Sequence, residues 1–572
     1  MVGWTGILIV LFYFLLQYWA IRSAGRQTET KSLLSRPFIY SSSVAASGST
    51  WLYYGSTDYA AKYGSEFIGL YIGIVLVFTL GFPLLLKIVE LAKSEGIKSI
   101  SDFIGARYGK SFSVAALVTL ITTIGLIPYI SLQMTAIHYL FDVFGGSYDP
   151  HSHGEEIDSH LLVLLMILGI GYATISYSAR STYFTDGHDG LLRALAVDTV
   201  IKFVAFLFIG IAATTFLFGP PAEVLNRVAR YQADLPVRQM DVSVGNLVAL
   251  VLIGASSVLL LPSQFYLTVV ENRSEKELRT ARWFIPLTLL IAGLFVLPLA
   301  RIGPAVLGEH ASADFYFLSL PLYAGQYWLG VIAFAGGLSA ATTMVIFPSI
   351  ILSIMISNDL LPPVLIRRSS SPTETRDFTR TIPNLRRVAM LGILLAALAY
   401  QFTIFGHVDF TRLALISATA MMQLLPPFLG GLFWRRGTAR GARWGMLGGF
   451  CVWLYTMVLP TMLDMTSSLH ADGPFEFAVL RPYALFGLEA SNYVNGLFWS
   501  LSVNITLFIA GSHSRSATPL ERIQASVFIT RKRLVPECRR QSPAECDRQS
   551  AQGDNIEIHW QRTNRPRIQF LS

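Results

Sequence analysis

Residues 41–50 read SSSVAASGST, and they stand where a membrane span is expected. An apolar segment (FIY, residues 38–40) precedes this run and an aromatic segment (WLYY, residues 51–54) follows it. No residue in the run is larger than Val, and six carry a hydroxyl group. Irregular backbone at membrane depth is tolerated only where protein or a water-filled cavity surrounds it. The run therefore predicts an interrupted helix whose carbonyl and hydroxyl oxygens can bind a small cation or a polar solute.

A second interrupted span is predicted at LLLPSQF, residues 259–265. Pro262 has no backbone N–H, so a continuous helical hydrogen-bond ladder cannot pass through it. This segment lies five hydrophobic segments after the first interruption. Two interrupted spans at matching positions of two halves are typical of secondary transporters.

The composition indicates an integral membrane protein. Only 14% of the 572 residues are charged and 53% are hydrophobic, whereas soluble proteins carry about 25% charged residues. The net charge of +8 does not indicate nucleic-acid binding, because the basic residues lie in short loops between apolar segments. Three cysteines, Cys451, Cys538 and Cys546, are too few and too scattered for a disulfide framework.

The apolar segments predict thirteen membrane helices. Their ranges are 4–21, 37–56, 66–86, 112–142, 161–178, 194–218, 244–270, 283–300, 326–358, 388–406, 410–434, 444–463 and 491–511. Loops after odd-numbered spans hold most of the loop Lys and Arg, so the N-terminus is expected outside and the C-terminus in the cytoplasm. The first span has no basic residue before it, which favours a retained helix over a cleaved signal peptide.

Three motifs resemble the sodium:solute symporter family over residues 1–512. They are the small-residue run at 41–50, SISDFIGARYG at 99–109, and GGLSAATTMVIFPSIILSIMISNDL at 336–360. The segments TYFTDGHDGLLRA (182–194) and PLERIQASVF (519–528) are most similar to the transporter domain of CbrA-type sensor histidine kinases. No kinase motif follows them here, so we expect that transporter domain without its kinase.

The resemblance implies an all-α integral membrane protein with LeuT-like inverted five-helix repeats. The two repeats are expected at residues 37–218 and 244–434, with one helix before them and two after. Residues 1–512 are expected to form this membrane domain. Residues 513–572 are expected to form a weakly ordered cytoplasmic tail, helical around 520–528.

The resemblance also implies a cation site. Its ligands are expected from the first interrupted helix and from the ninth span: Ala45, Gly48, Gly336, Ser339 and Thr343. Ala340 stands where many family members carry a second hydroxyl, and Thr343 could replace it only if the helix rotates. The coupling ion is therefore expected to be Na⁺ or H⁺. Alternatively, these small residues serve only close helix packing.

Asp198 and Lys202 lie four residues apart on the sixth span and share one helix face. Ionisable residues inside a span are functional candidates by default. The resemblance places Asp198 on the ion pathway, and a proton-coupled mechanism would make it the titrating group. The alternative is a structural pair whose charges neutralise each other.

Solute-binding residues are expected where both interrupted helices meet spans 4 and 11. The candidates are Ser47, Ser49, Trp51, Tyr129, Gln133, Ser263, Gln264 and Gln423. Since no buried Arg is expected there, a solute carboxylate would have to bind backbone amides at a helix N-terminus. A zwitterionic amino acid fits such a site. Each of these side chains could instead serve helix packing.

The sequence thus predicts a symporter, and not an enzyme, for a small polar solute such as the amino acids histidine or proline. It needs no cofactor beyond Na⁺ or H⁺, and its partners are the solute and the bilayer of a bacterial inner membrane. The alternative is the solute-sensing membrane domain of a truncated sensor histidine kinase, which would report to a cytoplasmic signalling partner through its tail.

Overall fold

The computed structural model describes most of the chain. The described residues are 2–24, 35–46, 51–145, 169, 189–234, 243–308, 311–360, 378–404, 410–462, 473–474, 477–488 and 490–530. The expected span at 161–178 and the tail beyond 530 therefore lie outside the description, apart from residue 169.

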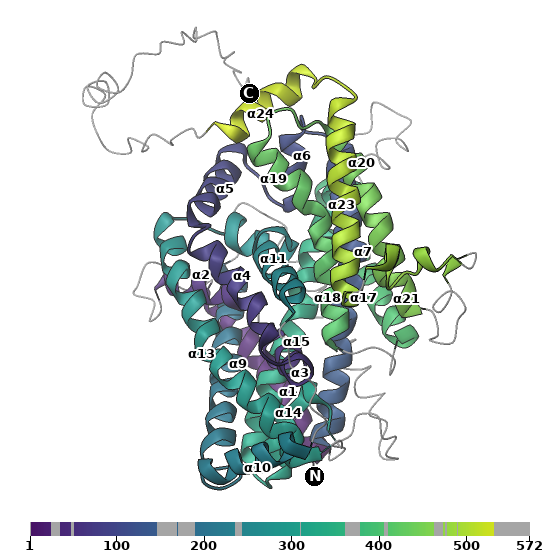
Figure 1. Ribbon diagram of the computed structural model, residues 1–572. Helices are drawn as coiled ribbons and strands as arrows, with labels where there is room; N and C mark the ends of the chain where they lie inside the picture. The colour runs from purple at the N-terminus through teal and green to yellow at the C-terminus, as the bar shows by residue number, and fades with distance from the viewer. Residues whose placement is uncertain are drawn as a thin grey trace, which may run out of the picture. The chain divides into compact units, whose positions relative to one another are not determined.

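Within the described residues all regular structure is helical (Figure 1). The α-helices of the first half are α1 (Val2–Ala24), α2 (Arg36–Ala45), α3 (Ser56–Tyr63), α4 (Ile68–Phe78), α5 (Phe82–Glu95), α6 (Ile100–Arg107), α7 (Phe112–Phe144), α9 (Asp189–Thr215) and α10 (Pro221–Asp234). Those of the second half are α11 (Val244–Leu260), α12 (Pro262–Phe265), α13 (Glu275–Leu307), α14 (Tyr316–Tyr323), α15 (Tyr327–Met355), α17 (Phe378–Ile404), α18 (Phe410–Met421), α19 (Leu425–Phe433), α20 (Ala439–Trp453), α21 (Leu459–Met462), α23 (Asn492–His513) and α24 (Pro519–Ile529).

Shorter π and 3₁₀ turns connect or extend these helices. The π turns are η2 (Trp51–Gly55), η4 (Tyr266–Val270), η7 (Ile356–Leu360) and η9 (Leu454–Val458). The 3₁₀ turns are η3 (Gly64–Phe67), η6 (Ala313–Phe315), η8 (Met422–Leu424), η11 (Ala478–Leu480) and η12 (Leu485–Gly487).

Among the described residues, ten helical segments are long and apolar enough to cross a membrane, or eleven if the bent pair α11–α12 is one span. The expected number of thirteen is therefore not confirmed. One expected span lies outside the description. In addition, α2 has only 10 residues, and the segment Trp51–Phe78 counts as a single candidate span.

The interruption predicted at Pro262 is confirmed. α11 ends at Leu260, Leu261 has extended backbone (φ −66°, ψ 121°), and α12 begins at Pro262. The chain bends by 54° between α11 and the segment that follows. A residue before proline is disfavoured in the helical region, which explains why the helix stops there. At the first predicted interruption, α2 ends at Ala45 and helical structure resumes at Trp51, with residues 47–50 outside the description.

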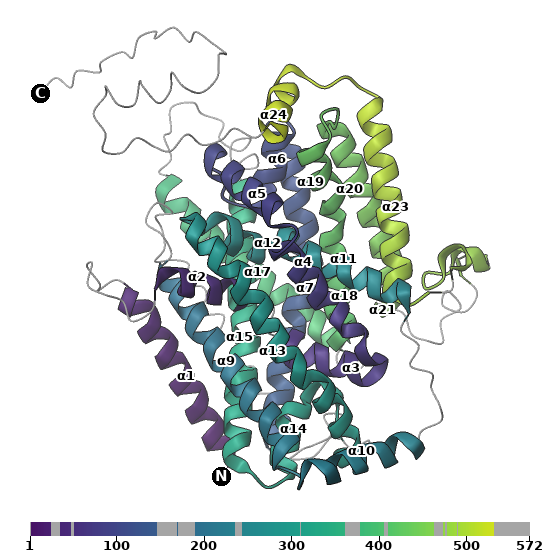
Figure 2. The ribbon, with the colours of Figure 1, turned by 60° about the vertical axis from the view of Figure 1, so that its left-hand side comes forward.

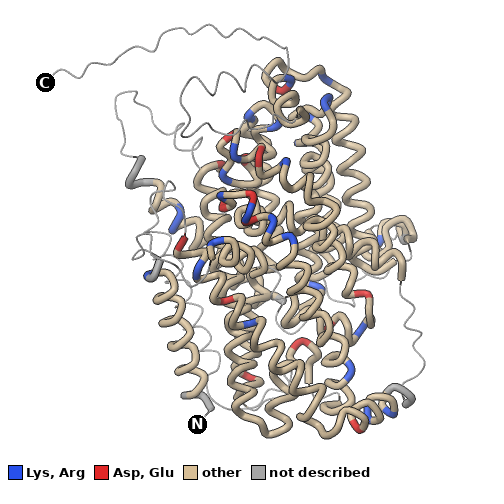
Figure 3. The backbone as a smooth tube through the Cα atoms, turned by 90° about the vertical axis from the view of Figure 1, so that its left-hand side faces the viewer, with Lys and Arg blue, Asp and Glu red and all other residues tan. Residues whose placement is uncertain are grey.

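The helix bundle of residues 1–530 has two ends that can be recognised in the figures. α5, α6, α19 and α24 lie at one end, called here the α6 end, and α10, α14 and the start of α1 lie at the other, the α10 end (Figures 1 and 2). Lys and Arg gather in the half nearer the α6 end and also occur on α10 (Figure 3).

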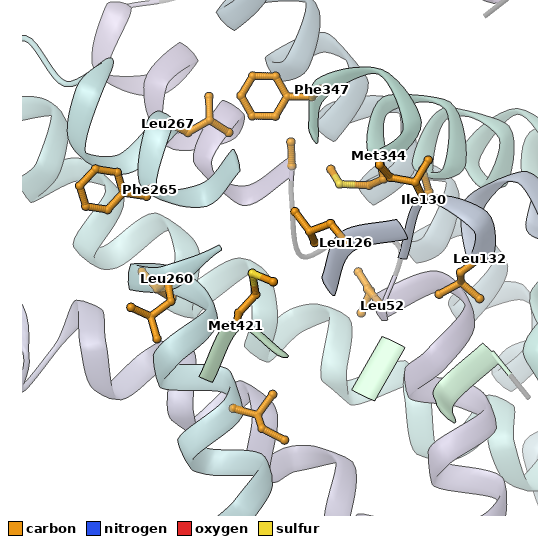
Figure 4. Packing of buried hydrophobic residues seen from close by; sticks show 14 of the residues in the cluster. Leu52, Leu126, Ile130, Leu132, Leu260, Phe265, Leu267, Met344, Phe347 and Met421 are labelled. Carbon is orange, nitrogen blue, oxygen red and sulfur yellow. The ribbon is translucent and has the colours of Figure 1, made fainter. Parts of the chain in front are cut away.

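Apolar side chains pack closely around the interrupted helices. Leu126, Met344 and Met421 converge there from α7, α15 and α18, beside Leu52 of η2 (Figure 4). All four side chains are buried. This packing fixes the positions of the helices that carry the polar groups described below.

The α24 helix begins with the sequence-predicted segment PLERIQASVF and carries a capping box between Thr518 and Glu521. The compact unit continues to Thr530, and residues 531–572 lie outside the description. The domain boundary expected at 512 stays a prediction.

Two glycines let α4 and α11 cross in close contact. A Cβ atom at Gly73 would stand 2.1 Å from the Val251 carbonyl oxygen, and one at Gly254 would stand 2.1 Å from the Leu70 carbonyl oxygen. Small residues allow helix backbones in membranes to approach in this way. The crossing joins the two predicted repeats.

Replacing Gly254 by Ala should destabilise the protein by about 2 kcal/mol, because the new methyl group meets backbone that has to move. The measurement is the thermal midpoint of the purified protein in detergent. Gly392→Ala on α17 is the matched control, since a Cβ atom added there would have no neighbouring atom within 4 Å. Equal midpoints for the two variants would contradict the close crossing.

Candidate functional site

Asp198 and Lys202 form a buried ion pair on α9. The Lys202 Nζ atom lies 2.9 Å from Asp198 Oδ2, and the side chains are 2% and 1% exposed, respectively. The prediction that the two residues share one helix face is confirmed. Charges are almost never fully buried unless they are paired, so neither side chain can be lost without a large cost.

The Asp198 carboxylate accepts hydrogen bonds from five side chains. The donors are Tyr13 (2.9 Å) and Gln17 (3.4 Å) on α1, Lys202 on α9, and Ser339 and Thr343 on α15. An ionised carboxylate is a pure acceptor with about four lone-pair sites. The acceptor capacity of Asp198 is therefore fully used, and the set of donors matches an ionised carboxylate.

The end of α2 is held by side chains from two other elements. Three carbonyl oxygens accept hydrogen bonds there, two in the last turn of α2 and one in the residue that follows it: Ser42 from Thr199 (2.9 Å), Val44 from Gln264 (3.1 Å) and Ala46 from Lys202 (3.3 Å). The last carbonyls of a helix have no partner within the helix, and in a membrane each unsatisfied group is costly. α9 and α12 supply the missing donors.

We call Tyr13, Gln17, Asp198, Lys202, Ser339 and Thr343, with the Ala46 carbonyl, the Asp198 cluster. It joins α1, α9 and α15 to the end of α2. Thr342 adds to it by donating to the Tyr13 hydroxyl at 3.0 Å. Tyr53 adds a further link, because its hydroxyl donates to the Lys202 carbonyl at 2.9 Å.

Sequence reasoning did not include Tyr13 and Gln17 in this site. A usable signal was present, since the two residues stand four apart on an apolar span and so share one face. Polar groups on one face of a membrane helix indicate a protein neighbour rather than lipid. The sequence does not show which helix that neighbour is.

The structure brings some of the expected cation ligands together. Ser339 and Thr343 meet at Asp198. Ala45 lines the cavity described below, and Gly336 is buried so closely against Tyr53 that a Cβ atom would stand 2.1 Å from its hydroxyl oxygen. Gly48 lies outside the described residues. The described residues hold no group of three or more His, Cys, Asp or Glu that could bind a metal ion.

A cavity of about 150 Å³ lies next to the Asp198 cluster. It is lined by Val44, Ala45, Trp51, Leu52, Tyr54, Gly55, Leu70, Tyr71, Ile74, Phe78, Tyr129, Leu132, Thr199, Lys202, Phe203, Ile253, Ser257, Val258, Leu261, Gln264, Ile285, Thr288, Leu289, Phe410, Ala414 and Ala418. Most of these side chains are apolar, and Lys202 is the one charged residue among them. Usual ligand pockets measure about 300–1,000 Å³, so this cavity suits a small solute.

Three of the expected solute-binding residues line this cavity: Trp51, Tyr129 and Gln264. The Trp51 indole nitrogen and the Gln264 amide oxygen are buried and have no hydrogen-bond partner among the residues that the structure describes. Buried polar groups normally have partners, and an exception needs an explanation. A bound solute that accepts a hydrogen bond from the Trp51 N–H and donates one to the Gln264 amide oxygen would supply both missing partners.

The other expected solute-binding residues lie elsewhere. Gln133 and Ser263 are fully buried, are not among the lining residues, and have side-chain polar atoms without a partner in the described part of the chain. Gln423 donates to Ser500 at 2.9 Å and accepts from Asn504 at 3.1 Å, so it joins η8 to α23. Ser47 and Ser49 are outside the description.

Comparison with known proteins gives a relative and two solved structures. An uncharacterized symporter of Bacillus subtilis, YodF, is 21% identical over 429 residues, which cover 74% of this chain and 80% of that protein. A Na⁺-coupled sialic acid symporter in its substrate-bound, outward-open state aligns with a TM-score of 0.62 at 13% identity, over 90% of this chain and 99% of the other. A manganese transporter of Eremococcus coleocola aligns with a TM-score of only 0.43 at 13% identity, over 88% of this chain and 98% of the other. No family model matches the chain.

These findings confirm the expected fold class, an all-α membrane protein with the LeuT-like fold. The similarity to YodF, an uncharacterized symporter, supports a transporter and not an enzyme. The substrate, sialic acid, is a property of that symporter and is not transferred to this chain. At 13% identity the structural match shows only that the two folds are similar.

Asp198→Asn should destabilise the protein by about 3–5 kcal/mol, because it leaves the Lys202 ammonium buried without a counter-charge. Asp198→Asn combined with Lys202→Met should recover most of that loss, since no uncompensated charge then stays buried. The measurement is a double-mutant cycle on the free energy of unfolding in detergent.

The exposed pair Glu275–Arg279 on α13 is the matched control, with the same spacing and a distance of 2.8 Å. Replacing either Glu275 or Arg279 alone should change the free energy of unfolding by less than about 1 kcal/mol, because exposed ion pairs contribute little to stability. A double variant of Asp198 and Lys202 as unstable as Asp198→Asn alone would contradict the role of charge compensation.

Proposed function

We propose that this protein is a secondary active transporter for a small polar solute, an amino acid such as histidine or proline, coupled to Na⁺ or H⁺. The observation that carries the proposal is the pair of unpartnered groups, the Trp51 N–H and the Gln264 amide oxygen, in residues that line one small cavity. The Trp51 N–H can donate to the carboxylate of a zwitterion, and the Gln264 amide oxygen can accept from its ammonium group. The apolar lining matches the side chain of the solute.

The two groups come from the two interrupted segments, which supports the cavity as the solute site. Trp51 opens η2 and Gln264 belongs to α12. In transporters with inverted repeats the solute binds near the membrane centre at discontinuous helices. The likeness to YodF and to a symporter fold supports the same role.

We further propose that the α6 end faces the cytoplasm of a bacterial inner membrane. The start of α1 lies at the α10 end, whereas α24 lies at the α6 end (Figure 2). Lys and Arg gather nearer the α6 end (Figure 3), as the positive-inside bias requires. The N-terminus is then outside, and the residues after α24 begin on the cytoplasmic side.

Uptake by the reconstituted full-length protein tests the proposal. Liposomes carrying the protein should accumulate at least one labelled amino acid of a panel that includes histidine and proline, under an imposed Na⁺ or proton gradient. Protein-free liposomes are the control. Absence of concentrative uptake for the entire panel under both gradients would contradict the proposed function.

Trp51→Phe should raise the KM for the transported amino acid about tenfold and leave the amount of protein in the membrane unchanged. The substitution keeps the aromatic ring and removes the N–H donor, and a hydrogen bond to a charged group contributes about 1.5–3 kcal/mol. Trp444→Phe is the control, because Trp444 is exposed and does not line the cavity. An unchanged KM in Trp51→Phe would show that the indole N–H does not contact the solute.

A second candidate function, a solute-sensing membrane domain, is favoured by the way α24 is docked. Phe528 packs against Phe103 of α6 with ring centroids 5.3 Å apart. The Glu521 carboxylate accepts from the Ala439 backbone N–H at 3.0 Å. A helix held on the bundle by such contacts can report a change at the solute site to residues beyond it. Hydrogen exchange distinguishes the functions: a sensor changes the protection of residues 519–529 when solute binds and shows no net uptake.

A further inference from the structure

We propose that the Lys202 ammonium is itself the cation of the Asp198 cluster, so that solute transport requires no Na⁺ at this position. The inference rests on the proposed transport function and concerns which cation the site holds. Lys202 then determines ion specificity, because it is a tethered cation that cannot be exchanged for an ion from solution.

The position of Lys202 is the first argument. Its Nζ atom lies between the Ala46 carbonyl at the end of α2 (3.3 Å) and the Asp198 carboxylate (2.9 Å), which in turn accepts from Ser339 and Thr343 of α15. A Na⁺ expected between the carbonyls of α2 and the hydroxyls of α15 would share this small region with an ammonium group. Like charges a few ångströms apart repel strongly in a buried site.

The second argument is that the oxygen atoms are already engaged. The Asp198 carboxylate accepts five hydrogen bonds, and the Ala46 and Val44 carbonyls accept from Lys202 and Gln264. A Na⁺ would have to displace these donors, whereas the lysine ammonium is itself a donor with three protons. The cluster is therefore complete with Lys202 in place.

The third argument is charge balance. Among the described residues, the three helices that supply partners to the pair, α1, α2 and α15, contribute no further unpaired charge close to it. α15 carries no charged residue, α1 contributes the neutral Tyr13 and Gln17 and has its one charge at Arg22, and the charge of α2, Arg36, is paired with Asp189 and Glu277. The cluster is neutral with Lys202 and would carry one negative charge without it. Removing the ammonium thus leaves a carboxylate, two hydroxyls and a carbonyl around the space that it filled.

Sodium binding to the purified protein tests the proposal without knowledge of the solute. The probes are radioactive Na⁺ in a binding assay, and the thermal midpoint in NaCl compared with choline chloride at equal ionic strength. The proteins are wild type, Lys202→Ala, the double variant Lys202→Ala with Asp198→Asn, and Lys276→Ala. Lys276 is exposed on α13 and serves as the control for losing a lysine.

Wild type and Lys276→Ala should bind no Na⁺ and show equal midpoints in the two salts. Lys202→Ala should bind about one Na⁺ per chain, and NaCl should raise its midpoint by about 3 °C or more, because a ligand that binds only the folded state stabilises it. n-Propylammonium should compete with that Na⁺, since it carries the missing group. The double variant should lose the Na⁺ binding again.

Stoichiometric Na⁺ binding by wild type would overturn the proposal, and this measurement does not depend on any variant folding. Absence of Na⁺ binding in a folded Lys202→Ala protein would overturn it as well, because the space would then not be a cation site. Failure of the transport function is seen separately, as the absence of amino acid uptake by wild type. Sodium-independent uptake by wild type agrees with the proposal.

Discussion

The contact between Lys202 and Asp198 is the interaction on which the rest of the site depends. An unpaired charge of either sign, buried on a membrane-spanning helix, would cost much free energy, so each of the two residues requires the other. Their remaining hydrogen-bonding capacity is then satisfied by groups of three further elements, α1, α2 and α15. One ion pair thereby fixes the positions of four helices that are distant in the sequence.

The need to satisfy backbone polar groups explains why the interrupted helices meet at this place. The end of α2 exposes carbonyls, and Thr199, Lys202 and Gln264 supply donors to them from α9 and α12. The same Gln264 side chain keeps its amide oxygen without a partner among the described residues, in the lining of the cavity. The interruption at the end of α2 therefore has two consequences. It determines which side chains gather at the site, and it places the unpartnered Gln264 amide oxygen where a solute can bind.

The fold was predictable from the sequence because its main signals are local. Pro262 alone ends a helix, and the spacing of Asp198 and Lys202 places them on one face. The partners of that pair were only partly predictable. Tyr13 lies 185 residues from Asp198, and local periodicity does not show which helices pack together. Gln423 illustrates the same limit, because its partners Ser500 and Asn504 lie on a helix about 80 residues later, outside the predicted repeats.

A density map of the protein purified in sodium chloride, at a resolution that shows side chains, tests the central claim most directly. The account predicts continuous density for the Lys202 side chain, with its ammonium between the Asp198 carboxylate and the Ala46 carbonyl. Lys202 turned away from Asp198, with density for a separate ion among Asp198, Ser339 and the end of α2, would contradict it.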